Sequence, residues 1–386
     1  MKSKIFVTSP LLPNLDNLLL SMQDIWKRKW ITNSGFYHQE LEKKLADYLD
    51  VPYISLMANG TLSLLVALCT CLEKNPLGNN GGGYEVITTP YTFCATAHAI
   101  VWSGATPVFC DIDPRTGNID PNKIESLITK NTKAIMPVHV YGNPCDTNAI
   151  QKIADKYNLK VIYDAAHAFG VKKDGKSILL QGDLSCLSFH ATKTYNTIEG
   201  GAVICKTKEA KEIIDRIRDF GIQDENTILE AGINCKMDEI RAAYGIENLK
   251  KIDDAIQKRK KIAQLYRKML KNKDGIRLFE EDPCVTYNYS YFPIFIDENR
   301  FPVSRDDVYD ILKSNDILTR KYFFPLVSNL PVYRNILSAK MELLPNANTM
   351  SKQVLCLPIH HELSESDAEG ISLLILNTSI ENGTNR

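Results

Sequence analysis

The sequence lacks an excess of charge of either sign. Its 386 residues contain 46 lysines and arginines against 46 aspartates and glutamates, so the formal net charge at pH 7 is zero. Proteins that bind nucleic acid through its phosphates usually carry a basic surplus, and no block of like charge suggests an interaction tail. The composition therefore gives no indication of nucleic acid as a partner.

The ten cysteines lack the spacing of a metal site or of a disulfide framework. No two of them have the Cys-x-x-Cys spacing of zinc ribbons and redox motifs. The adjacent residues His360, His361 and Glu362 are the one clustered set of metal-ligand types, and they do not form the His-Glu-x-x-His motif of zinc proteases. We expect no metal, and reduced, mostly buried thiols in a cytoplasmic protein.

We expect neither a signal peptide nor a membrane-spanning segment from this sequence. MKSKIFVTSP at the start has no long apolar core. Residues 54–72 carry no charge over a length that could cross a bilayer, but the turn Asn59-Gly60-Thr61 divides them into a strand and a helix. The glycine-rich patch at 78–83 does not join an apolar strand to a helix, which favours a loop over a dinucleotide-binding turn. We expect no contact with membranes.

Short apolar runs alternate with helical patterns from about residue 50 to residue 205. Fully apolar strands that alternate with helices are typical of an α/β protein whose sheet is largely parallel and covered on both faces. The expected strands are 53–57, 85–90, 106–112, 133–142, 160–166, 185–190 and 201–206. The expected helices are 61–73, 92–104 and 146–158, the last with Ile150, Ile153, Ala154 and Tyr157 on one side.

A second region begins near residue 250 with a long, charged amphipathic helix. A strand-like run at 289–296 and a helix near 305–315 follow it. The expected organisation is a large α/β domain over residues 1–250, built on a mostly parallel seven-stranded sheet, and a smaller α+β domain over residues 251–386. In such a sheet, ligands bind at the carboxyl ends of the strands.

Polar residues gather where the predicted strands end. Asn59-Gly60-Thr61 follows the strand 53–57, and Thr61 can cap the helix after it. Free backbone N–H groups at that helix start favour a phosphate, although a plain helix cap is the commoner meaning of such a turn. Asp164 follows another buried strand, where a carboxylate needs a cation or several hydrogen bonds. Alone, it could also be a loop cap or a metal ligand, and His167 beside it is more often structural than catalytic.

Lys193 lies in SFHATKTYNTIEGG (188–201), among small and hydroxylated residues. A lysine that attacks a carbonyl must be neutral, and it is usually desolvated or close to other cations. An isolated lysine is far more often an ordinary surface residue. The combination is more specific, because pyridoxal phosphate needs a phosphate cup, an acidic partner for its ring nitrogen and a lysine for its Schiff base. Gly60 and Thr61, Asp164 and Lys193 supply these three anchors in order.

The sequence resembles the DegT/DnrJ/StrS sugar aminotransferases, which have the aspartate aminotransferase fold (fold type I). The resemblance covers nearly the whole chain, through KWITNSGFYHQELEKKLADYL, TTPYTFCATAHAI, PVHVYGNPCD, YDAAHAFG, SFHATKTYNTIEGG, GINCKMDEIRAAYG and VLCLPIHHELSE. Within the family, it is similar to the branch that makes dTDP-4-amino-4,6-dideoxyglucose (viosamine).

The resemblance implies a role for each matched residue around the cofactor. Lys193 forms the Schiff base and then shuttles a proton, while Asp164 keeps the ring nitrogen protonated. Ser188 adds a second hydroxyl to the phosphate site of Gly60 and Thr61. On the ring, Phe93 stacks against one face and His167 lies near the ring hydroxyl.

The resemblance also implies contacts with a second subunit and with the sugar nucleotide. Asn234 matches a residue that reaches into the neighbouring subunit's site, which implies a homodimer with composite active sites. The family more often has aromatic residues at the flanking positions, here Ile233 and Cys235. Substrate contacts are expected from Thr32, Asn33, Arg320 and Tyr322. Arg320 and Lys321 suit a diphosphate electrostatically, with a solvated loop as the alternative, and the roles of His190 and Glu199 stay open.

The implied reaction is a two-step transamination. The amino group passes from L-glutamate to the C4 ketone of dTDP-4-keto-6-deoxy-D-glucose and gives dTDP-4-amino-4,6-dideoxy-D-glucose, a type of sugar used in lipopolysaccharide O-antigens. The alternatives are a C3-aminotransferase and an aminotransferase for a GDP- or UDP-linked keto sugar, which differ in the shape of the sugar pocket. Dehydratases of the same fold carry histidine in place of the lysine, and a non-catalytic regulator would not need a complete site.

Overall fold

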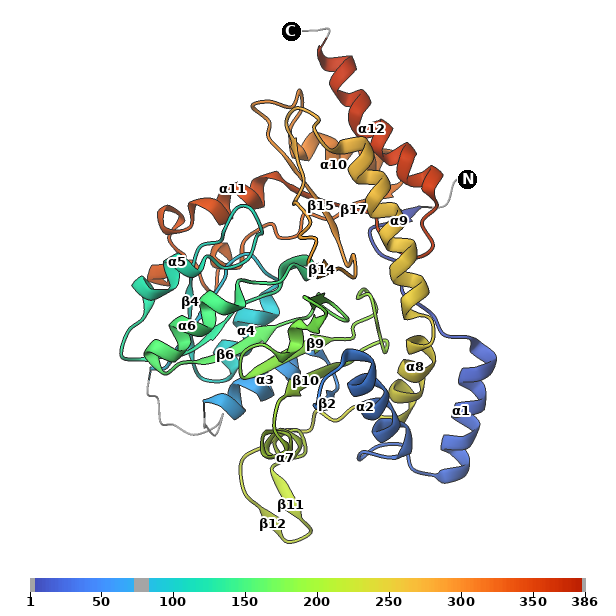
Figure 1. Cartoon of the computed structure of the whole chain (residues 1–386), viewed down its shortest axis with the longest axis vertical. Helices are drawn as coiled ribbons and strands as arrows, with labels where there is room; N and C mark the ends of the chain where they lie inside the picture. Colours follow the sequence, from blue (N-terminus) through green and yellow to red (C-terminus); the bar gives the residue numbers. More distant parts are fainter. Residues whose placement is uncertain (1–3, 73–82, 384–386) are drawn as a thin grey trace.

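A seven-stranded sheet forms the centre of the molecule (Figure 1). The computed structural model describes residues 4–72 and 83–383, so most of the glycine patch predicted as a loop lies outside the described residues. The strands are β2 (Tyr53–Met57), β3 (Glu85–Thr88), β4 (Thr106–Phe109), β5 (Thr132–Met136), β6 (Lys160–Asp164), β9 (Leu184–Ser188) and β10 (Gly201–Cys205). Their order is β2-β10-β9-β6-β5-β3-β4.

Most of this sheet is parallel. The five strands from β9 to β4 run parallel to their neighbours, whereas β10 is antiparallel to both β9 and β2. This confirms the predicted fold class. The strand predicted at 133–142 is too long, because β5 ends at Met136 and Pro137, which follows it, has no N–H for a ladder hydrogen bond.

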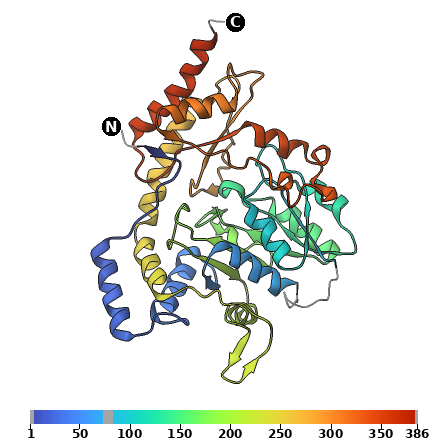
Figure 2. The same ribbon diagram turned by 180° about the vertical axis from the view of Figure 1, so that it is seen from behind.

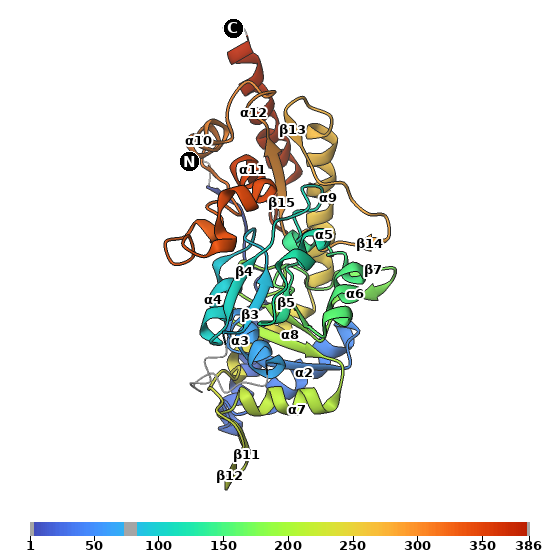
Figure 3. The ribbon, with the colours of Figure 1, turned by 90° about the vertical axis from the view of Figure 1, so that its left-hand side faces the viewer.

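Helices cover both faces of the sheet, as Figures 2 and 3 show from behind and from the side. One face packs against α2 (Phe36–Leu49), α6 (Thr147–Tyr157) and α8 (Glu239–Leu249). The other packs against α3 (Gly60–Cys71), α4 (Cys94–Trp102) and α7 (Lys208–Ile217). Both faces need cover because successive side chains of β10 point to opposite faces and are apolar on each. Ala202 and Ile204 pack into the core on the first face, and Val203 and Cys205 pack into the core on the second.

The C-terminal part of the chain builds a smaller α+β unit beside the sheet (Figure 1). Its three-stranded sheet has the order β13 (Ile276–Arg277), β15 (Phe292–Ile296), β17 (Val354–Leu357). The long helix α9 (Ile252–Leu270) packs against α12 (Glu365–Gly383), and α10 (Arg305–Ser314) and α11 (Pro345–Gln353) complete the unit.

Two strand pairings cross the predicted boundary at residue 250. The N-terminal β1 (Ile5–Phe6) pairs with β16 (Ile317–Leu318), and β14 (Val285–Thr286) pairs with β7 (Lys172–Lys173). The division into 1–250 and 251–386 stays a prediction. These pairings join the C-terminal part of the chain to its N-terminal strand and to the segment that follows β6.

The uncharged run at 54–72 divides into β2 and α3, as the turn at Asn59-Gly60-Thr61 predicted. Among the helices in residues 4–72 and 83–383, none has the length and apolar character that a membrane crossing requires.

The start of β10 lies against the start of α3, and only a glycine fits between them. A Cβ atom added to Gly201 would lie 2.5 Å from Ser63 Oγ and 2.7 Å from the Asn59 carbonyl group. Gly201 therefore allows the first turn of α3 to sit directly on the sheet.

We expect Gly201→Ala to lower the free energy of unfolding by about 1–3 kcal/mol, because overpacking against backbone atoms cannot relax easily. The matched control is Gly370→Ala in α12, where an added Cβ meets nothing within 4 Å. That change should raise the same free energy by roughly 0.5–1 kcal/mol, since alanine is favoured in a helix. Urea denaturation measures both, and equal effects from the two substitutions would contradict the close approach.

Candidate active site

A cavity of about 260 Å³ opens at the carboxyl ends of β2, β6 and β9. This is the position at which open α/β sheets bind ligands. It brings together residues from distant parts of the chain, and the predicted site residues that line it are Gly60, Thr61, Phe93, Asp164, His167, Ser188, Lys193 and Tyr322. His190 and Glu199 also line it.

One end of the cavity is built to receive an anion. In the part of the chain that the structure describes, the N–H groups of Gly60 and Thr61 have no backbone acceptor, because they begin α3. A Cβ added to Gly60 would lie 2.7 Å from Ser188 Cβ, so glycine is needed for the approach of the Ser188 hydroxyl. Two backbone donors, two hydroxyl groups and the positive end of the helix dipole meet here.

The expected cap of this helix was wrong. Asn59 is the N-cap residue, and its side-chain oxygen accepts a hydrogen bond from the Leu62 N–H at 2.9 Å. The Thr61 side chain is exposed and stays available to a ligand. Because the helix already begins at Gly60 with Asn59 as its cap, Thr61 lies inside the first turn and is not needed as a cap.

Asp164 ends β6 as a buried carboxylate with partial hydrogen bonding. Its Oδ2 accepts from the Thr96 hydroxyl at 2.7 Å, and its Oδ1 accepts from the Ala166 N–H at 3.1 Å. Because the proton of Thr96 goes to Asp164, the 2.9 Å contact between Thr92 and Thr96 is donated by Thr92. Burial raises the pKa of Asp164, and the two hydrogen bonds and the Lys193 charge oppose this. The carboxylate can accept one further, cationic donor.

Lys193 lies in a tight turn after β9. Its N–H donates to the His190 carbonyl at 2.8 Å, and its Nζ donates to the Tyr291 hydroxyl at 3.3 Å. Among the described residues it forms no ion pair with a carboxylate. Burial lowers the pKa of Lys193 to about 8, against the opposing effects of Asp164 and Tyr322. A substantial fraction of this side chain is therefore a neutral amine near pH 8, the form that attacks carbonyl carbons.

His167 is a neutral hydrogen-bond donor. Its Nδ1 accepts from the Tyr141 N–H at 3.1 Å, which assigns the ring proton to Nε2. Its ring lies parallel to Phe323 and meets the Tyr291 ring edge-on, with centroids 4.8 Å apart. Burial, with the nearby Lys193 charge, holds the pKa of His167 well below its ordinary value. It can donate from Nε2 but does not carry a charge at neutral pH.

His190 and Glu199 form a polar pair on the pocket wall. The Nε2 of His190 lies 3.5 Å from Glu199 Oε1, and its Nδ1 contacts Thr192 at 2.8 Å. Both side chains are close to half exposed. The pair therefore faces the space that a substrate would occupy.

Four predicted residues do not line this pocket. Thr32, Asn33, Arg320 and Asn234 are exposed. Their roles stay predictions, and that of Asn234 concerns a second subunit. The neighbouring Lys321 has its Nζ 2.5 Å from Asp306 Oδ1, so a diphosphate would compete with this carboxylate for the ammonium.

The sequence-based prediction missed Thr96 and Tyr291. Thr96 follows Thr92 by one helical turn at the start of α4, and that spacing was a usable signal. Tyr291 comes from the segment before β15, almost one hundred residues after Lys193. The polar and aromatic run NYSY before an apolar strand was its only sign in the sequence.

The chain matches the model of the DegT/DnrJ/EryC1/StrS aminotransferase family over residues 16–374. It is 50% identical over 371 residues to a dTDP-4-amino-4,6-dideoxy-D-glucose transaminase from Escherichia coli, across 96% of this chain and 97% of that protein. A protein of the same name from Shigella dysenteriae is 49% identical, across 96% and 98%. The crystal structure of DesI in the presence of its TDP-sugar product is similar, with a TM-score of 0.91 and 30% identity across 100% of this chain and 95% of that one.

We expect Lys193 in the ligand-free protein to react with amine reagents with a pH midpoint near 8, compared with about 10.4 for a free lysine side chain. Asp164→Ala should lower this midpoint, because the carboxylate favours the ammonium form. Peptide mass spectrometry of the modified protein measures the rate at each pH.

Glu199→Gln is the matched control, since it removes a carboxylate of the same pocket that lies beside His190. It should leave the midpoint of Lys193 unchanged. A midpoint near that of free lysine in the unsubstituted protein would contradict the desolvated amine.

Proposed function

This chain belongs to the DegT/DnrJ/EryC1/StrS aminotransferase family, and we propose that it moves an amino group from L-glutamate to the C4 ketone of dTDP-4-keto-6-deoxy-D-glucose. The products are 2-oxoglutarate and dTDP-4-amino-4,6-dideoxy-D-glucose. The observation that carries this proposal is the 50% identity, over 96% of the chain, to a transaminase named for that amino sugar.

The protein is a pyridoxal-phosphate-dependent aminotransferase, and its pocket residues fit this cofactor. The close approach of Gly60 to Ser188 leaves an anion cradle that any larger side chain would fill. Asp164 is a buried carboxylate that lacks a cationic hydrogen-bond partner among the described residues. When bound, pyridoxal phosphate supplies an aldehyde that carries the amino group between substrates and a ring that withdraws electrons from the reacting carbon.

Different residues of the pocket bind different parts of the cofactor. We assign the phosphate to Gly60, Thr61 and Ser188, whose donors meet at the start of α3. Asp164 would accept a hydrogen bond from the protonated ring nitrogen, and the desolvation of the carboxylate would make that charged hydrogen bond strong. His167, neutral and protonated at Nε2, donates to the ring hydroxyl oxygen. Phe93, whose side chain is exposed at the pocket, covers one face of the ring.

Lys193 is the group that forms the covalent link and moves the proton. With a pKa of about 8, the amine would take up a proton from the substrate carbon and deliver it to the cofactor carbon that bears the amino group, at neutral pH and without a large energy difference. The turn that bonds the Lys193 N–H to the His190 carbonyl fixes the base of the side chain. The desolvation that lowers the pKa of Lys193 favours the neutral, reactive amine.

The substrate contacts follow from the edge of the pocket. Tyr322 lines it, and Arg320 lies two residues earlier with an exposed side chain that can pair with a diphosphate. Thr32 and Asn33 lie in the exposed loop between α1 (Leu15–Arg28) and α2, which we also assign to the sugar nucleotide. A cytoplasmic location is supported by ten cysteines that are all free.

We also propose a homodimer with shared active sites. Helix α1 packs on α8 with one side and exposes Leu15, Leu19, Leu20 and Trp26, and the nearby Trp30 and Ile31 are exposed as well. Apolar surface of this kind usually marks an interface. A second copy of the chain would cover it and would bring Asn234 toward the partner's pocket. Sedimentation velocity should give twice the chain mass of 43.5 kDa, and a single-chain mass would contradict the dimer.

Purified protein loaded with pyridoxal phosphate should convert dTDP-4-keto-6-deoxy-D-glucose and L-glutamate into a dTDP-linked 4-amino sugar. Nuclear magnetic resonance of the product identifies the aminated carbon and its configuration. Lys193→Ala should lose turnover by several orders of magnitude, because no other group can take its covalent role.

The GDP-linked and UDP-linked 4-keto sugars and a dTDP-linked 3-keto sugar serve as competing substrates. A GDP-perosamine synthase from Escherichia coli O157:H7, 34% identical to this chain, makes the GDP-linked substrate the sharpest comparison. Preference for one of these sugars, or amination at C3, would overturn the assigned substrate and leave the aminotransferase class intact.

A further inference from the structure

Tyr291 brings a phenol group from the C-terminal part of the chain into the catalytic pocket. Its hydroxyl oxygen accepts the hydrogen bond from Lys193 Nζ at 3.3 Å, and Nζ lies 5.8 Å from the centre of its ring. The same ring meets the His167 ring edge-on. Within the described residues this is the one hydrogen bond of the Lys193 amine.

The segment that carries Tyr291 is fixed to both of its catalytic neighbours. Asn288 Nδ2 donates to the His167 carbonyl at 2.9 Å, and the Ser290 hydroxyl donates to the same carbonyl at 2.7 Å. Thr194, the residue after Lys193, contacts the Ser290 hydroxyl at 3.0 Å. The phenol therefore moves together with the backbone that holds His167 and Lys193.

A buried cation secures the segment from behind. Arg259 of α9 is 1% exposed, and its Nη1 donates to the carbonyl groups of Tyr289, Ser290 and Ile359 at 3.3, 3.4 and 2.9 Å. The buried guanidinium needs these carbonyl acceptors, because its Nε has no hydrogen-bond partner among the described residues. The Tyr291 backbone is thus positioned before any ligand binds.

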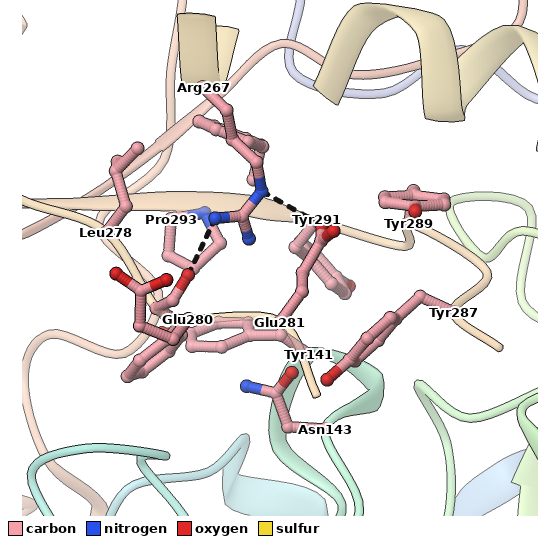
Figure 4. A pocket seen from close by; sticks show the side chains of 12 residues that line it. Tyr141, Asn143, Arg267, Leu278, Glu280, Glu281, Tyr287, Tyr289, Tyr291 and Pro293 are labelled. Carbon is pink, nitrogen blue, oxygen red and sulfur yellow. Dashed lines mark hydrogen bonds and ion pairs between the residues drawn. The ribbon is translucent and has the colours of Figure 1, made fainter. Parts of the chain in front are cut away.

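On the other side of Tyr291 lies a second cavity of only about 40 Å³ (Figure 4). Tyr141, Tyr287 and Tyr289 line it, and Tyr291 lines both this cavity and the catalytic pocket. The space is too small for a substrate. Tyr289 lines the small cavity and not the catalytic pocket. It is therefore a suitable control for Tyr291, which lines both.

The groups around Lys193 show why a neutral hydrogen-bond partner keeps its amine able to gain and lose a proton. They are Asp164 from β6, His167 from the following loop, and Tyr291 and Tyr322 from the C-terminal part. Burial raises the pKa of Tyr291 far above its ordinary value, so the phenol stays neutral. A neutral hydroxyl accepts from an ammonium and donates to an amine, whereas a carboxylate would favour the ammonium strongly.

We propose that the Tyr291 hydroxyl is the resting partner of the free Lys193 amine and holds Nζ at the reacting position whenever the lysine is not bonded to the cofactor. Tyr291 is then a catalytic residue, because its hydroxyl group contacts Lys193 Nζ, the atom that forms and breaks the covalent bond to the cofactor. Its effect on turnover rests on the proposed function. The hydrogen bond between Tyr291 and Lys193 does not depend on which substrate the protein uses.

The test compares Y291F with Y289F, which removes a hydroxyl from the same segment outside the catalytic pocket. In cofactor-free protein, Y291F should lower the pH midpoint of Lys193 modification by about one pH unit, because a charged donor loses its acceptor. It should also slow the capture of added pyridoxal phosphate several-fold, followed by absorbance. In turnover, kcat should fall while the KM for the keto sugar stays unchanged.

Y289F should match the unsubstituted protein in each measurement. Equal midpoints and equal capture rates for Y291F and Y289F would overturn the proposal. If the protein aminates none of the keto sugars but Y291F still shifts the midpoint and the capture rate, the proposed function fails and the role of Tyr291 stands.

Discussion

The site depends on a lysine that loses its proton easily although it lies in the same pocket as a carboxylate that must stay ionised. A direct ion pair between Lys193 and Asp164 would favour the ammonium form of the lysine and would occupy the carboxylate that must receive the ring nitrogen. The structure avoids it by giving each group other partners. Asp164 accepts from Thr96 and from a backbone N–H, and Lys193 donates to a phenol. Burial then lowers the pKa of Lys193 to about 8 and leaves the carboxylate ready for a cationic ring nitrogen.

The side chains that keep Lys193 and Asp164 apart come from two parts of the chain, the large sheet and the C-terminal unit. Neighbouring parallel strands β6 and β9 deliver Asp164 and the Lys193 turn to one edge of the sheet, and α3 adds its N-terminus there. The C-terminal part supplies the aromatic wall with Tyr291 and Tyr322. Hydrogen bonds from the 288–290 segment to the His167 carbonyl join the two sources, so the pocket is complete only when both parts of the chain have folded together.

The sequence predicted the half of the site that follows from strand order. Asp164 ends β6 and Lys193 lies in the turn after β9, and the ends of parallel strands meet at one edge. Tyr291 could not be predicted in this way, because its approach depends on how the smaller unit sits against the sheet. The wrong prediction of the helix cap has a local cause. Asn59 took the capping role expected of Thr61, because the helix begins one residue earlier than predicted.

The central claim is that Lys193 is the residue that bonds covalently to pyridoxal phosphate. Sodium borohydride converts a carbon–nitrogen double bond between lysine and the cofactor into a stable amine, and mass spectrometry of the digested protein then locates it. The account predicts the added pyridoxyl group on the peptide that contains Lys193. A group found on another lysine, or no addition to any peptide of the loaded protein, would contradict it.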